Sequence, residues 1–444
     1  RLLFNRRCGL IAGGLLAGSV LLVAEAHQAK SDAVLLVTIL LMFWPLARLY
    51  PAAGAAVQDS ASPPAWPRWV FWAGLGASIM VKGPIGLLVV GLFLATLTLL
   101  ERRLAWLRAL VYWPAIVLAV VIALPWYVAI TIASDGAFLA QAIGRDLAPK
   151  LAGGVEAHGA WPGYYTMLTL LMAWPASLFL WPTLLGWRQA WSIPAVKFMI
   201  AWALPSLLVF ELIPTKLPHY VLPVYPALML ITAAAVSGAV GPLADTLRGR
   251  PAKIWAFIWA LIGLVLGIAG GVVMVRFGGD GGITAWLWAA TSLAAAMLAG
   301  FAGWRYIWRA GNPTDLIFTL VAAALVLAVL TGGVLPRAGD LQVSKRLAAV
   351  AKQHGADAAR AITGYHEPSA VFLMGTELAL TTPQGVADHL RRHPAGLAFV
   401  EARMDPAFQA AIESLGLKVA EKAVVQGLNY SRGRPVTIRL YTRR

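Results

Sequence analysis

A few charged side chains lie among apolar residues, where they could bind an anion or transfer a proton. Lys82 lies at a break between two apolar runs, in "MVKGPIGLL", and no acidic residue lies within ten positions of it. Lys216, His219 and Tyr220 lie in "ELIPTKLPHYVLPVYPAL", whose four prolines prevent a regular helix from starting early. An ammonium group binds phosphate well, so we expect Lys82 and Lys216 to bind one. The alternatives are a Lys82 that reaches the membrane surface and a rigid interfacial loop around Lys216.

Asp32 is the acidic residue that could act as a general base. It lies in "SDAVLL", directly before an apolar run. A carboxylate in this place could accept the proton of a substrate hydroxyl. The same Ser31-Asp32 pair is also a plain signal for the N-terminus of a helix, and both interpretations stay open.

The segment 131–163 is the longest polar stretch between apolar runs. It contains Arg145, Asp146, Lys150, Glu156 and His158, and Tyr164 and Tyr165 follow it. Two cations near a membrane surface could hold a lipid phosphate. Glu156 and His158 are ligand types that a divalent metal accepts, although two ligands alone leave a metal site incomplete.

The composition is that of a membrane protein. Of the 444 residues, 59% are hydrophobic and only 13% are charged, against about 25% charged in soluble domains. The 19 tryptophans and 11 tyrosines suit two interfacial belts. The net charge of +16 does not indicate nucleic-acid binding, because the basic residues flank apolar runs and form no stripe. Cys8 is the one cysteine, which excludes an internal disulfide and a cysteine zinc site.

The apolar runs predict about eleven membrane-spanning helices, since about 20 apolar residues cross a bilayer. The run between residues 67 and 100 is either one kinked span or two short ones that separate at Gly83-Pro84. Two spans place most basic loop residues on one side, as the positive-inside rule requires. Lys82, Asp32, the segment 131–163 and Lys216 then share the external side. The candidate spans are 10–26, 33–48, two within 67–100, 109–130, 164–184, 194–211, 220–239, 254–275, 284–303 and 314–334.

A second domain is expected after the last span. Residues 1–336 form the membrane domain and residues 337–444 a small α/β domain on the external side. Its expected strands are "AITGY", "VFLMG", "GLAFVEA", "KVAEKAVV" and "PVTIRLYT", and its expected helices are "LQVSKRLAAVAKQHG", "PQGVADHLRRH" and "DPAFQAAIESLG".

Several motifs together resemble a known family. The sequences "SDAVLL", "MVKGPIGLL", "LPWY", "EAHGAWPGYY" and "TKLPHYVLPVYPAL" occur in that order within residues 1–235. In this they resemble the bacterial GT-C glycosyltransferases that use polyprenyl-phosphate sugars, the aminoarabinose-transferase-like and protein-mannosyltransferase-like family. The resemblance implies a polytopic α-helical membrane enzyme with a periplasmic C-terminal domain. It also implies a location in the bacterial inner (plasma) membrane, with the active site on the periplasmic side.

The resemblance implies that the enzyme transfers a sugar, with inversion, from a polyprenyl-phosphate donor to lipid A, another cell-envelope glycan or a protein. Lys82, Lys216 and Arg145 would bind the donor phosphate, with His219 and Tyr220 beside them, and Asp32 matches an acidic position near the cavity. No cofactor is certain; a divalent metal at Glu156 and His158 is the one candidate. The family's principal catalytic aspartate lies in a first external loop that this sequence lacks, so we expect the chain to be truncated at its N-terminus. The resemblance thus implies that the general base comes first from that loop, with Asp32 as the second candidate.

Two alternatives from other classes stay open. A transporter or flippase of lipid-linked substrates is expected to show inverted repeats and broken helices near the midplane, and the sequence shows no repeat. A membrane-anchored binding protein would act through residues 337–444. Neither the sugar nor the acceptor can be read from the sequence.

Overall fold

The computed structural model describes residues 2–28, 30–50, 65–102, 104–142, 144, 160–278, 282–309 and 311–444. These fall into two compact units. The first comprises Arg1–Val265 and Ala295–Leu327, and the second Leu266–Ala294 and Ala328–Arg444. The division that the sequence predicts, between residues 336 and 337, falls inside the second unit, which contains helical segments besides the α/β domain.

In the part of the chain that the structure describes, the elements of the first unit are helices, as the long apolar runs require, because a helix satisfies its own backbone groups in lipid. Its elements are α1 (Arg6–Ala17), α2 (Val20–Ala26), α3 (Asp32–Leu49), α4 (Trp66–Lys82), α5 (Ile85–Glu101), η3 (Ala105–Leu110), α6 (Trp113–Ala133), α7 (Ala137–Gln141), α9 (Tyr164–Met172), α10 (Ser177–Leu185), α11 (Pro194–Leu212), η5 (Pro218–Val224), α12 (Tyr225–Val236) and α13 (Gly241–Thr246). The helices α14 (Arg250–Phe277), α15 (Ile283–Trp308) and α16 (Pro313–Ala328) contribute to both units.

Within the described residues, seven helices are long and apolar enough to cross a membrane. They are Asp32–Leu49, Trp113–Ala133, Pro194–Leu212, Pro218–Val236, Arg250–Phe277, Ile283–Trp308 and Pro313–Arg337. The bent pair α1 and α2, at 59°, makes an eighth if it counts as one span. The predicted polytopic helical fold is thus confirmed. The eleven spans expected from the sequence also include α4, α5 and the pair α9 and α10, which are shorter.

The break at "VKGP" separates two helices, as the sequence predicts. Helix α4 ends at Lys82, and Gly83 has a φ of +59° that L side chains rarely adopt. The chain then reverses, since a Cβ on Gly86 of α5 would lie 2.3 Å from Oγ of Ser78 in α4. The turn thus leaves Lys82 at the end of a helix.

The second unit contains a five-stranded sheet with the order β2-β1-β3-β5-β4. Strands β2, β1 and β3 are parallel, and β5 is antiparallel to both β3 and β4. The elements of this unit, after the ends of α14 to α16, are η6 (Val329–Val334), α17 (Leu335–Arg337), η7 (Gly339–Leu341), α18 (Val343–Gly355), β1 (Arg360–Thr363), α19 (Pro368–Met374), β2 (Ala379–Leu380), α20 (Pro383–Arg392), β3 (Leu397–Glu401), η8 (Ala402–Met404), α21 (Asp405–Ser414), β4 (Val419–Asn429) and β5 (Arg434–Arg443).

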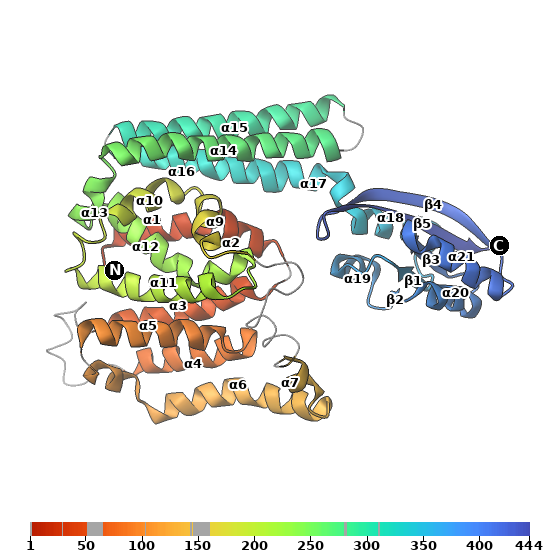
Figure 1. Cartoon of the computed structure of the whole chain (residues 1–444), viewed down its shortest axis with the longest axis horizontal. Coiled ribbons are helices and arrows are strands. Elements are labelled where there is room, and N and C mark those ends of the chain that lie inside the picture. The colour runs from red at the N-terminus through yellow and green to blue at the C-terminus, as the bar shows by residue number, and fades with distance from the viewer. Residues whose placement is uncertain are drawn as a thin grey trace. The chain divides into compact units, whose positions relative to one another are not determined.

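Helices cover both faces of this sheet, so β1 and β3 are largely buried on both sides, while the edge strand β2 is partly exposed. Ile362 and Phe399 pack with α18 and α19 in one apolar cluster. Ala361 and Ala398 point the other way and pack with α20 and α21. The α/β architecture predicted from the sequence is therefore present (Figure 1).

One predicted strand of this domain is wrong. The segment "VFLMG" lies in the helix α19, not in a strand. Pro368 begins this helix, where its fixed φ favours helical geometry. The apolar run is too short for its periodicity to distinguish a strand from a helix. The short strand β2 that follows was not predicted.

Candidate functional site

Asp32 and Lys82 form a pair at the ends of two adjacent helices. Asp32 is the first residue of α3 and is buried, and Lys82 is the last residue of α4, with its side chain 25% exposed. The Lys82 ammonium donates a hydrogen bond to Oδ1 of Asp32. The helix dipole favours a negative charge at the N-terminus of α3, where Asp32 lies, and a positive charge at the C-terminus of α4, where Lys82 lies. Ser31 makes no side-chain capping bond, so the main contact of this segment is the ion pair.

His219 brings a third element, η5, to the pair. Its Nε2 lies 3.8 Å from Oδ2 of Asp32, and its Nδ1 lies 3.7 Å from Oε1 of Glu25 in α2. Lys30 lies 3.9 Å from the same Glu25 oxygen. The imidazole therefore lies between two buried carboxylates, which makes Asp32, Lys82, His219 and Glu25 one charged cluster.

Glu25 is a member that the sequence interpretation missed. It is buried, and its Oε2 has no hydrogen-bond partner among the described residues. The sequence feature that could have identified Glu25 is its position as the single acidic residue of an otherwise apolar helix, "VLLVAEA". A carboxylate in such a place is costly and is by default a functional candidate.

Tyr220 lies beside the same lysine. The Nζ of Lys82 is 6.0 Å from the centre of the Tyr220 ring, and the His219 and Tyr220 rings meet edge to face with centroids 5.1 Å apart. Four residues singled out from the sequence, Asp32, Lys82, His219 and Tyr220, are therefore together in the structure. They come from α3, α4 and η5, which are far apart in the chain.

Lys216 has different contacts. Its buried ammonium donates to the carbonyl oxygens of Phe210 (3.4 Å), Glu211 (2.7 Å) and Ile213 (2.7 Å). These carbonyls lie at the C-terminal end of α11, where a cation is favourable. Phosphate binding by Lys216 stays a prediction, and it would require the ammonium to exchange these backbone acceptors for a phosphate.

Glu211 connects this end of α11 to the start of α9. One carboxylate oxygen accepts from the Gly163 amide at 3.0 Å, and the other accepts from the amide and hydroxyl of Thr166 at 2.8 and 3.0 Å. This cap holds the first turn of α9, which carries Tyr164 and the buried Tyr165. Lys216 lies 5.6 Å from the centre of the Tyr165 ring, so both tyrosines belong to the framework around Lys216.

The remaining predicted residues lie outside the described part of the chain. These are Arg145, Asp146, Lys150, Glu156 and His158. The structure therefore does not test phosphate binding by Arg145 or metal binding by Glu156 and His158.

The charged cluster itself offers a set of metal ligands. One donor atom each from Glu25, Asp32 and His219 lies within 4.8 Å of the others. Carboxylate and imidazole donors suit zinc and similar divalent ions, and the unpartnered Oε2 of Glu25 leaves a lone pair available. The Lys82 ammonium on Asp32 competes with a cation for that carboxylate. The cluster could thus hold a divalent ion only if the Lys82 ammonium moved away from the Asp32 carboxylate.

Comparison with curated proteins finds a consistent set of relatives. The chain is 31% identical over 170 residues to an undecaprenyl phosphate-alpha-4-amino-4-deoxy-L-arabinose arabinosyl transferase of Serratia proteamaculans. It is 29% identical over 266 residues to the protein of that name in Yersinia enterocolitica. These matches cover 38% and 56% of the chain, and 30% and 46% of the two relatives. The chain is a homologue of these arabinosyl transferases. No family model matches it.

The fold agrees with this relationship. The crystal structure of ArnT from Cupriavidus metallidurans bound to undecaprenyl phosphate superposes with a TM-score of 0.67 at 16% identity, covering 98% of this chain and 79% of that chain. The apo form of the same protein gives 0.69 at 14% identity, covering 97% and 79%. The chain therefore has the fold of ArnT, a GT-C glycosyltransferase, as the sequence motifs predicted. The matched regions span about a third to a half of the length of the curated relatives.

Proposed function

We propose that the chain is a glycosyltransferase that takes a sugar from a polyprenyl-phosphate donor and passes it to lipid A, another cell-envelope glycan or a protein. The observation that carries this proposal is the cluster of Asp32, Lys82 and His219 in a chain with the ArnT fold. The relatives are named for a donor that carries aminoarabinose on undecaprenyl phosphate, which makes that compound the first donor to test. The proposed location is the bacterial inner membrane, with the cluster and residues 337–444 on the periplasmic side.

In the proposed reaction an acceptor hydroxyl attacks the anomeric carbon. The new bond joins the acceptor oxygen to that carbon, the bond from the carbon to the phosphate oxygen breaks, and polyprenyl phosphate leaves with the electron pair. Because attack and departure occur on opposite faces, the anomeric configuration inverts. The hydroxyl proton must pass to a base, and Asp32 is the described carboxylate closest to Lys82.

Lys82 supplies the main electrostatic contribution in this proposal. The leaving phosphate gains negative charge in the transition state, and an ammonium held at a helix end in apolar surroundings stabilises that charge strongly. The exposed quarter of the Lys82 side chain is the part that a phosphate can reach. When the phosphate binds the ammonium, the Asp32 carboxylate loses part of its hydrogen bond and becomes the better base. A divalent ion at Glu25, Asp32 and His219, when bound, would add positive charge at the same place.

The test is turnover of defined donors by the purified protein in lipid nanodiscs, with a cell-envelope extract as acceptor. Radiolabelled undecaprenyl-phosphate sugars are compared, and release of undecaprenyl phosphate is measured. We expect release with one donor and its loss in Lys82→Met. The matched control is Lys197→Met, which removes a half-buried lysine that pairs with Glu101 instead and should keep turnover. Release by no donor, or equal release by Lys82→Met, would refute the proposal and favour a transporter or binding protein.

A further inference from the structure

The α/β domain has the topology at which open parallel sheets usually bind ligands. In the sheet, β1 lies between β2 and β3 and is parallel to both. The chain passes from β1 to β2 on one side and then crosses to β3 on the other side. The strand order therefore reverses between β1 and β3. In such sheets ligands bind beyond the carboxyl ends of the strands, at the point where the order reverses. A ligand is therefore expected at the edge of the sheet that follows Thr363 in β1 and Glu401 in β3.

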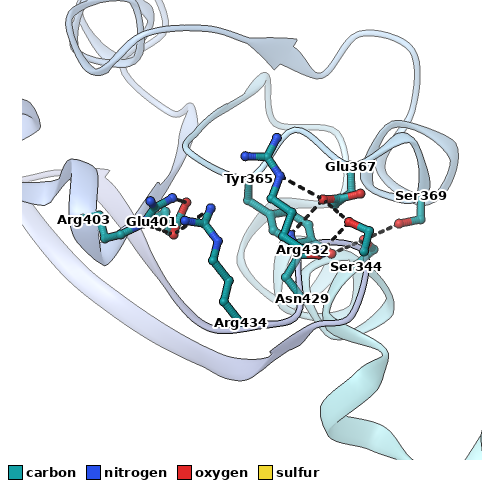
Figure 2. A network of polar contacts seen from close by, with 10 residues as sticks. Ser344, Tyr365, Glu367, Ser369, Glu401, Arg403, Asn429, Arg432 and Arg434 are labelled. Carbon is teal, nitrogen blue, oxygen red and sulfur yellow. Dashed lines mark hydrogen bonds and ion pairs between the residues drawn. The ribbon is translucent and has the colours of Figure 1, made fainter. Parts of the chain in front are cut away.

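Figure 2 shows two groups of polar side chains at this edge, one around Glu367 and one around Glu401. Glu367, from the segment after β1, accepts hydrogen bonds at Oε1 from Nδ2 of Asn429 and Oγ of Ser431, both at 2.8 Å. Arg432 lies 3.9 Å from the same oxygen. The turn between β4 and β5 is thus tied to the carboxyl end of β1, and it brings its arginines to that edge.

The end of β3 adds a buried carboxylate that orders two arginines. Glu401 accepts from Nε and Nη2 of Arg403 at 2.6 and 2.8 Å, and Nη2 of Arg434 lies 3.7 Å from it. Gly364, with a φ of +84°, allows the chain to close over this carboxylate, since a Cβ there would lie 2.6 Å from Cβ of Glu401. The guanidinium groups are thereby held in place before any ligand arrives.

The charge at this edge is not balanced. Three arginines, Arg403, Arg432 and Arg434, face two carboxylates, Glu367 and Glu401. The side chains of Arg403 and Arg434 are 52% and 30% exposed. The Nε of Arg434 is buried and has no hydrogen-bond partner among the described residues. Positive charge and exposed guanidinium edges therefore coincide.

We propose that this edge of the α/β domain is a binding site for a phosphate monoester carried by a sugar or by a lipid headgroup. Guanidinium groups bind phosphate through paired hydrogen bonds, and Arg403 and Arg434 are positioned to offer their outer edges to one ligand. The domain as a whole supports an anionic ligand, because residues 337–444 contain 15 lysines and arginines and nine acidic residues. Its residues belong to the second unit and those of the Lys82 cluster to the first, and the inference does not depend on the proposed transferase reaction.

The experiment measures binding of glucose 6-phosphate to the whole protein in nanodiscs of uncharged lipid by isothermal titration calorimetry. We expect saturable binding that inorganic phosphate displaces. Arg403→Gln and Arg434→Gln should each weaken it about tenfold or more, the effect of losing a charge-assisted hydrogen bond. The matched control is Arg443→Gln, which removes the same charge from an exposed position at the far end of β5 and should leave binding unchanged.

Competition identifies the source of the phosphate. Displacement by dihexanoyl phosphatidic acid, with no displacement by dihexanoyl phosphatidylcholine, supports a lipid headgroup. Displacement by sugar phosphates alone supports a soluble sugar phosphate. Circular dichroism of each variant checks that the protein is folded. Because the Arg403 side chain is half exposed, Arg403→Gln is the variant least expected to disturb the fold.

Absence of saturable binding by the folded wild-type protein would overturn the inference. So would equal weakening in Arg443→Gln, which would show a general charge effect. Lys82→Met separates this site from the proposed active site, because that variant should lose transfer and still bind glucose 6-phosphate as the wild-type protein does. Loss of binding in Lys82→Met would also contradict a separate site.

Discussion

Asp32 and Lys82 share one hydrogen bond, so the state of each depends on the other. The Lys82 ammonium donates a hydrogen bond to the Asp32 carboxylate; in the proposed reaction, a phosphate on Lys82 would make this carboxylate available to His219 and to an acceptor hydroxyl. Glu25 completes this arrangement from the other side of the imidazole. The cluster thus contains a cation and carboxylates of the kind that the proposed reaction requires, for the leaving phosphate and for the hydroxyl proton.

Asp32→Asn tests the carboxylate. Asparagine keeps a hydrogen-bond acceptor for Lys82 but removes the negative charge, so proton acceptance should fail. We expect turnover to fall about 10²- to 10⁴-fold, the range of general-base catalysis, with little change in donor binding. Asp245→Asn is the control, since Asp245 lies in α13, its carboxylate is exposed, and its ion-pair partner among the described residues is Arg248. Turnover of Asp32→Asn within a factor of two of wild type would rule out Asp32 as the base.

Lys216→Met separates a structural role from a phosphate-binding role. Loss of its bonds to three carbonyls of α11 should cost about 1.5–3 kcal/mol of unfolding free energy, as for hydrogen bonds from charged donors. A lower thermal midpoint of the purified protein is therefore expected, larger than the change in Lys197→Met. An unchanged midpoint together with lost donor turnover would instead support the phosphate contact that the sequence predicts.

Much of the site could be inferred from residue type alone, because charge in apolar surroundings demands an explanation. Lys82, Asp32 and His219 were identified in this way, and the structure places them together. The contacts of Lys216 could not be inferred, since its carbonyl partners are set by how α11 ends. Glu25 was missed although it carries the same signal as Lys82, a single charge in an apolar helix.

At the scale of elements, the prediction succeeded where a physical constraint acts on the local chain. Gly83-Pro84 forces a break, and α4 and α5 separate there. The patterns of apolar residues in their segments similarly predicted β1, β3, β4 and β5. The helix α19 was assigned wrongly because a run of a few apolar residues fits either state, and packing against the sheet decides between them.

The helix α20 carries a pH-sensitive contact. Burial lowers the pKa of His389 below its ordinary value of 6.5, and the nearby His393 and Arg392 lower it further, although a contact with the Ala359 backbone opposes this. Between the lowered folded pKa and the ordinary unfolded pKa, the unfolded chain binds more protons than the folded domain. The domain should therefore lose stability as the pH falls below about 6.5.

Pulse proteolysis in urea at pH 7.5 and pH 5.5 measures this effect on the whole protein. We expect a lower urea midpoint of the α/β domain at pH 5.5 in the wild type and a smaller difference in His389→Gln. His354→Gln, at an exposed position of α18, should retain the wild-type difference. A wild-type midpoint independent of pH would contradict a neutral, buried His389.

At the scale of the whole molecule, hydropathy and fold agree with the relationship to the arabinosyl transferases. The fold match to ArnT covers 98% of this chain, and therefore both the long apolar helices and the C-terminal α/β domain. The overall architecture could be predicted because bilayer thickness and backbone hydrogen bonding leave few alternatives. The sugar and the acceptor could not, because they depend on side-chain contacts within a pocket.

The most direct measurement is the affinity of the protein for undecaprenyl phosphate, compared between wild type, Lys82→Met and Lys197→Met by native mass spectrometry from nanodiscs. If Lys82 holds the donor phosphate, Lys82→Met should bind about tenfold or more weakly, and Lys197→Met should bind as the wild type does. Equal affinity in all three proteins would show that the phosphate binds elsewhere and would contradict the proposed site.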